Sequence, residues 1–134
     1  MIRTYMKNRK NRKGFSLIEL LIVIAIIGII ATIAIPLLLS ARNNAINEKA
    51  RNSLRTVSSA EAAYFAANGK YGSADDLINP PAPQSPYLDA RFSSGDLGQG
   101  ITVTINDSDQ TFTADATGAT VNYTVDESGN VTEQ

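Results

Sequence analysis

The apolar residues of this 134-residue chain are concentrated in one early block instead of being spread along its length. Residues 20–39 form a stretch without charge, and Thr32 supplies its only polar side chain. A helix of that length rises about 30 Å, which matches the hydrocarbon thickness of a bilayer. The pattern therefore predicts a membrane-spanning helix, which we place at residues 15–39.

Beyond residue 39 the apolar pattern becomes periodic. Apolar residues recur every three or four positions, at Ile46, Ala50, Leu54, Val57, Ala60 and Tyr64. The opposite side carries Arg42, Asn43, Asn47, Lys49, Arg51 and Arg55. This spacing is typical of an amphipathic helix with one face on a core. We expect the helix to continue through residues 40–67 and to stop at Asn68-Gly69, because glycine commonly follows a helix end.

The last third of the chain alternates apolar and polar residues. One face of the alternation would carry Ile101, Val103, Ile105, Phe112, Val121, Tyr123 and Val125. Such alternation predicts antiparallel strands, and a further short strand is expected around Val131. Upstream, Ser73 and Asp76 have the spacing of a capping box at the start of a short helix.

These elements together predict an α+β fold. A long N-terminal helix would pack its second half against a small antiparallel sheet. Residues 40–67 and 68–134 would then form one globular region, because so small a sheet needs a helix against it for stability.

Charge is divided as unevenly as hydrophobicity. Six of the 12 basic residues precede residue 14, namely Arg3, Lys7, Arg9, Lys10, Arg12 and Lys13. No acidic residue occurs before Glu19, so the chain from residue 15 onward has 6 basic and 13 acidic residues, a net charge of −7. The basic start predicts a cytoplasmic N-terminus and an exported C-terminal region. The acidic remainder argues against a nucleic-acid surface, which needs clustered Lys and Arg.

The chain has neither cysteine nor histidine. Disulfides are therefore excluded, and so are the imidazole and thiolate groups that serve most often as zinc ligands, general bases and nucleophiles. We expect a protein that is not an enzyme and that has no cofactor. Four acidic residues in expected turns, Asp107, Asp109, Asp126 and Glu127, are weak candidates for calcium ligands. Local hydrogen bonding within turns is the favoured reading of these residues.

The apolar block differs from an ordinary cleaved secretory signal. Its length exceeds the roughly 7–15 apolar residues of such signals, and no small-x-small cleavage site follows it. The block should therefore stay in the mature protein. Glu19 near its start is then costly in lipid. A cut between Gly14 and Phe15 would create an ammonium group one helical turn from Glu19, or within reach of a neighbour's Glu19.

These residues carry a resemblance to a known family. The basic leader ending in Lys10, Arg12 and Lys13, followed by Gly14, Phe15, Glu19 and the apolar block, resembles the class III signal of type IV prepilins and related pseudopilins. The resemblance implies that a prepilin peptidase removes residues 1–14 at the cytoplasmic face, and that a methyltransferase modifies Phe15. It also implies that Glu19 pairs with the Phe15 ammonium of an adjacent subunit in a helical homopolymer.

The resemblance extends to Gly28 and Pro36, which both weaken a helix. In the family, the stretch between a matching glycine and proline is often unwound in filaments, so we expect extension between Gly28 and Pro36 after assembly. The expected partners are other copies of the chain, the prepilin peptidase and methyltransferase, the inner-membrane assembly platform and, before assembly, the lipid bilayer.

Three kinds of function remain after this reading. The first is a type IV pilin of a surface filament for adhesion, motility or DNA uptake, which would move from the inner membrane to the cell exterior. The second is a minor pilin, or a pseudopilin whose periplasmic filament drives protein export by type II secretion. The lack of cysteine departs from many pilins, which close a C-terminal loop by a disulfide. A membrane-anchored enzyme or receptor is the third, and it explains neither Gly14-Phe15 nor Glu19.

Overall fold

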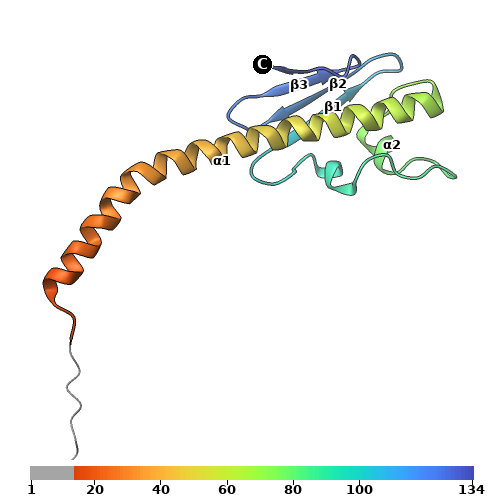
Figure 1. Cartoon of the computed structure of the whole chain (residues 1–134). Helices are drawn as coiled ribbons and strands as arrows, with labels where there is room; N and C mark the ends of the chain where they lie inside the picture. Colours follow the sequence, from red (N-terminus) through yellow and green to blue (C-terminus); the bar gives the residue numbers. More distant parts are fainter. Residues whose placement is uncertain (1–13) are drawn as a thin grey trace, which may run out of the picture. The chain divides into compact units, whose positions relative to one another are not determined.

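The computed structural model describes residues 14–134, and the chain divides into two compact units, Met1–Leu38 and Leu39–Gln134. The second unit is called the head below. Helix α1 (Leu17–Asn68) belongs to both units, and the head adds the short helix α2 (Ala74–Ile78) and the 3-10 helix η1 (Ala90–Ser94) (Figure 1). The strands are β1 (Thr102–Asp107), β2 (Phe112–Thr117), β3 (Tyr123–Asp126) and β4 (Val131–Glu133). The predicted α+β fold is confirmed.

The first unit exposes its apolar side chains. From Leu17 to Leu38 the large apolar residues are between 47% and 75% exposed. Among the residues that the structure describes, α1 is the one helix with the length and composition to cross a membrane. The first unit therefore has a surface that is unsuited to water.

Helix α1 is continuous through Gly28 and Pro36 in the single chain. Thr32 lies between them and donates its hydroxyl to the carbonyl of Ile29 at 2.7 Å. The extension expected between Gly28 and Pro36 concerns the assembled filament, and it stays a prediction.

The four strands form one antiparallel sheet in the order β1-β2-β3-β4. In register, Val103 lies opposite Ala116, which in turn lies opposite Tyr123. These three residues are buried, as are Phe112, Ala114 and Val125, while the alternate positions of the strands face solvent. The predicted inward residues are buried or half-buried, although Val121 lies just before β3, and the short strand at Val131 is confirmed.

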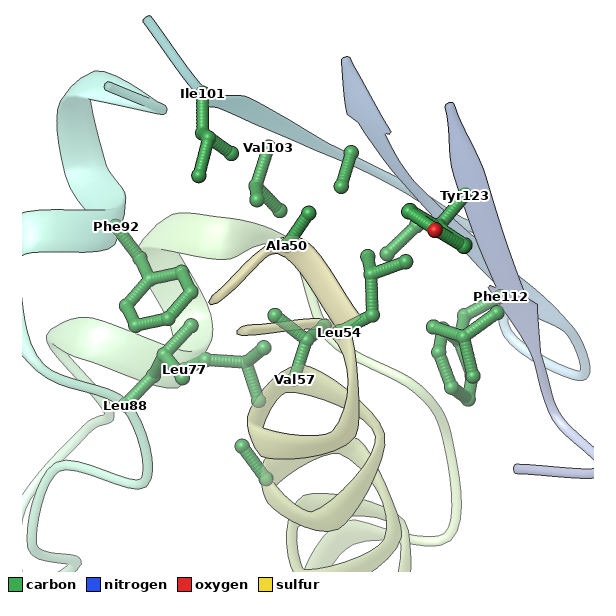
Figure 2. Packing of buried hydrophobic residues seen from close by; sticks show 14 of the residues in the cluster. Ala50, Leu54, Val57, Leu77, Leu88, Phe92, Ile101, Val103, Phe112 and Tyr123 are labelled. Atoms are coloured by element: carbon green, nitrogen blue, oxygen red, sulfur yellow. The ribbon is translucent and has the colours of Figure 1, made fainter. Parts of the chain in front are cut away.

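The core of the head lies between the second half of α1 and the inner face of the sheet. The apolar stripe predicted for α1 is buried from Ala50 to Tyr64, and Ile46 at its edge is half-buried. In Figure 2, Leu54 and Val57 project from α1 into the cluster, which Phe112 and Tyr123 complete from the strands. Three residues close the core from α2, η1 and the loop between them, namely Leu77, Leu88 and Phe92.

The connector after α1 is held by local capping. Helix α1 ends at Asn68, and Gly69 takes the left-handed conformation (φ 74°) that suits glycine after a helix. Helix α2 begins with the predicted capping box, because the Ser73 hydroxyl accepts from the Asp76 amide while the Asp76 carboxylate accepts from the Ser73 amide. The 3-10 helix η1 was not predicted; its N-cap is Asp89.

Candidate processing and assembly site

The peptide bond between Gly14 and Phe15 lies just outside α1. Residues 14–16 are not helical, and the Phe15 side chain is 88% exposed. A Cβ added at Gly14 would have no neighbouring atom within 4 Å. The bond that the sequence predicts to be cleaved therefore lies in irregular, open backbone, which is the form that a peptidase can bind.

Glu19 sits in the first turn of α1 and has a hydrogen-bond partner within its own chain. Its Oε2 accepts from the backbone amide of Ser16 at 2.8 Å, and its own amide donates to the Ser16 carbonyl at 3.1 Å. A carboxylate there also interacts favourably with the positive end of the helix dipole. The Ser16-x-x-Glu19 spacing is a capping signature that we did not use in the sequence analysis. Glu19 thus stabilises the start of α1 before any neighbour arrives.

The other residues predicted from the sequence to act in orientation or assembly are distributed along the chain. Lys10, Arg12 and Lys13 lie outside the described residues. Gly28 and Pro36 follow Glu19 by about 14 Å and 26 Å along the helix. The processing groups Gly14, Phe15 and Glu19 therefore form one local cluster at the start of α1, and Gly28 and Pro36 belong to a later segment of it.

The calcium candidates gather at one edge of the sheet without forming a metal centre. This edge is one end of the strands, where the β1–β2 and β3–β4 turns both lie because alternate hairpins of an antiparallel sheet turn at the same end. Asp126 accepts from the hydroxyl and the amide of Ser128, and these bonds lower the pKa of Asp126. Within residues 14–134, no group of three or more acidic side chains is placed to hold a metal ion. Turn hydrogen bonding accounts for Asp126.

Glu61 is a buried carboxylate that the sequence analysis missed. It is 0% exposed, its Oε2 accepts from the Gly72 amide at 3.0 Å, and burial raises its pKa to about 7. The sequence does contain a sign of this position, because Glu61 follows Val57 by four residues and precedes Tyr64 by three, which places it on the apolar stripe. Only the packing of the connector over α1 shows that the carboxylate is covered.

Comparison with known proteins agrees with the residues at the start of α1. Residues 9–35 match the family model of the prokaryotic N-terminal methylation motif, which contains Gly14, Phe15 and Glu19. No curated protein matches the chain significantly. The chain thus carries the class III signal of type IV pilins and pseudopilins, as the sequence predicted. The motif points to a pilin-like structural subunit rather than an enzyme, and with the apolar helix it fits a membrane-anchored precursor.

Proposed function

We propose that this protein is a type IV pilin. It is cut between Gly14 and Phe15, N-methylated on Phe15 and polymerised through α1 into a surface filament for adhesion, motility or DNA uptake. The observation that carries the proposal is the methylation motif on a helix whose first half has large apolar side chains that are 47–75% exposed, in a chain whose head has its own core.

The exposed apolar surface of the first unit needs a cover at every stage. Lipid covers it before assembly, since a helix satisfies its own backbone hydrogen bonds inside a bilayer. In a filament the same side chains pack against neighbouring copies, which keeps them out of water after the helix leaves the bilayer. The inner-membrane assembly platform would drive this exchange.

Glu19 contributes an electrostatic interaction when neighbouring subunits replace the lipid around α1. An ionised carboxylate accepts about four hydrogen bonds, so the bond from the Ser16 amide leaves capacity for the Phe15 ammonium of a neighbour. In an apolar interior two opposite charges are tolerated when they pair with good geometry, and one alone is expensive. We infer that each incoming subunit matches its Glu19 to such an ammonium group.

The second candidate is a pseudopilin of a type II secretion system, or a minor pilin. Both would use the same motif, processing and helix. The absence of cysteine leaves this candidate open, because a head without a disulfide departs from many surface pilins, but it also fits short pilins that lack cysteine. The two candidates differ in where the filament ends, at the cell surface or in the periplasm.

Intact-mass spectrometry of two fractions tests the proposal. Long fibres sheared from cells should contain a chain that begins at methylated Phe15. The same chain confined to the cell envelope would instead indicate a pseudopilin or a minor subunit. A Gly14→Leu variant is the control, because a bulky residue before the cut should leave the leader attached. A mature chain that begins beyond residue 41 would overturn the proposal.

A further inference from the structure

Glu61 connects α1 to the segment that follows it. The carboxylate lies two helical turns before the end of α1 and reaches the backbone of Gly72, eleven residues later. Its Oε2 accepts from that amide, whereas Oε1 is buried without a hydrogen-bond partner among the residues described. A buried carboxyl group with one oxygen that accepts no hydrogen bond is more stable in its neutral form than in its ionised form.

The segment at residues 69–73 fits closely over this carboxylate. A Cβ on Gly72 would lie 2.8 Å from Cε1 of Tyr64, so only glycine allows the backbone to approach so near. Tyr71 packs against Phe112, with 5.0 Å between ring centroids, and its amide donates to the carbonyl of Asp109 at 3.4 Å. The carboxylate is thus shielded from water by a short connector that contacts both α1 and the sheet.

The charged groups that act on Glu61 are both acidic. They are Asp107, the last residue of β1, and Asp76 of α2. Each disfavours a second negative charge nearby, and burial disfavours it further. Burial is the largest cause of the raised pKa of Glu61, the hydrogen bond from Gly72 opposes it, and the two aspartates add to it.

We propose that Glu61 and residues 69–73 form a proton-dependent latch. When Glu61 is neutral, the connector stays closed over it and holds Gly72 against α1. When Glu61 is ionised, the connector opens locally, because water can then reach the carboxylate without disruption of the sheet. This inference does not depend on the proposed filament function.

The direction of the pH dependence follows from the raised pKa. The closed form binds the proton more tightly than the open form, so closure is favoured below the ordinary pKa of 4.5 and weakens as pH rises to about 7. With these two values, the open-to-closed ratio should rise roughly tenfold between pH 6 and pH 8. Rising pH therefore shifts the latch toward its open form.

Hydrogen exchange of the full-length protein in detergent micelles tests the latch. Amides of residues 69–78 are followed at pH 6, 7 and 8 in the wild-type protein and in Glu61→Gln, whose amide oxygen still accepts from Gly72 but does not titrate. For each amide, the exchange rate in the wild-type protein is divided by the rate in Glu61→Gln, and this ratio cancels the intrinsic pH dependence of exchange. We expect that ratio to rise roughly tenfold from pH 6 to pH 8, while amides of β3 keep a constant ratio.

Two controls make the result decisive. Glu48→Gln changes an exposed glutamate of the same helix and should behave like wild type. The wild-type Glu61 carboxyl can also be titrated directly by 13C NMR, which needs no variant. A constant ratio at residues 69–78, an equal rise in β3, or a Glu61 midpoint near 4.5 would each overturn the latch.

Discussion

Two glutamates of α1 show different ways to place a carboxylate among apolar groups. Glu19 lies at the helix start, where its carboxylate accepts from the Ser16 amide near the positive end of the helix dipole. Glu61 lies in the core of the head, where a single amide donor faces it and burial favours its neutral form. Glu19 is thus ready to meet a cation, whereas Glu61 responds to protons.

A pair of substitutions separates the two functions of Glu19. Glu19→Ala removes the charge and the bond to Ser16, whereas Glu19→Gln keeps an acceptor for the amide and removes the charge only. We expect both variants to be processed and stable in the membrane, with at least about tenfold less sheared filament. An unpaired ammonium in the filament interior costs roughly 3–5 kcal/mol per subunit.

Quantification of sheared fibres by immunoblot, beside the membrane fraction, measures this effect. Glu48→Ala, at an exposed glutamate of the same helix, is the matched control and should leave assembly unchanged. Normal filament yield from Glu19→Gln would mean that the capping bond, and not the charge, is what assembly requires.

At the scale of elements, α1 has one backbone geometry and two environments. Its first half exposes long apolar side chains on every side, and its second half buries a single stripe against the sheet. Arg51 adds a polar connection from the second half to two strands, since its guanidinium binds Glu133 at 2.6 Å and lies 4.8 Å from the Tyr123 ring centroid. Equal substitutions in the two halves should therefore have unequal effects on the head.

Leu54 and Leu38 provide that comparison on one helix. Leu54 is 0% exposed and Leu38 is 71% exposed. Leu54→Ala should destabilise the head by about 2–5 kcal/mol, because it leaves a cavity. That loss lowers the melting temperature of a head of this size by about 8 °C or more.

Leu38→Ala should leave the melting temperature of the head unchanged. Near-ultraviolet circular dichroism, which reports the packing of the buried Tyr64 and Tyr123, follows melting of the head in both variants, in the full-length chain in detergent. Equal losses in the two variants would contradict the assignment of the core to the second half of α1.

At the scale of the whole molecule, the buried residues are confined to the head. Every buried residue among residues 14–134 lies between Ala50 and Val125. A chain of residues 39–134 should therefore fold without the apolar segment and stay monomeric in water. A well-dispersed amide NMR spectrum and a monomer mass by sedimentation would verify this.

A shorter chain supplies the control for that experiment. Residues 58–134 lack Ala50, Leu54 and Val57, so the inner face of the sheet would lose much of its cover. We expect this shorter chain to be unfolded or aggregated, since so small a sheet is unstable alone. Aggregation of residues 39–134 as well would mean that the head depends on the first unit.

The sequence by itself determined the features that depend on neighbours in the chain. Four features follow from local spacing and are confirmed by the structure. They are the apolar run, the stripe on residues 46–64, the alternation from Ile101 to Val125 and the capping box at Ser73. Gly14, Phe15 and Glu19 were also chosen by local spacing and lie within the matched residues 9–35, and their functions in processing and assembly stay predictions. Helix and strand periodicity are local properties, so they can be read without a fold.

Only the tertiary structure decided the environment of single polar groups. Glu61 occupies a helical position that is compatible with either solvent or core, and the connector from Gly69 to Ser73 places it in the core. The acidic turns lie at the same end of the sheet because successive hairpins turn at opposite ends, yet they form no metal centre within residues 14–134. Whether a polar group is covered, and which turns lie close together, depends on residues distant in the chain, which local spacing does not identify.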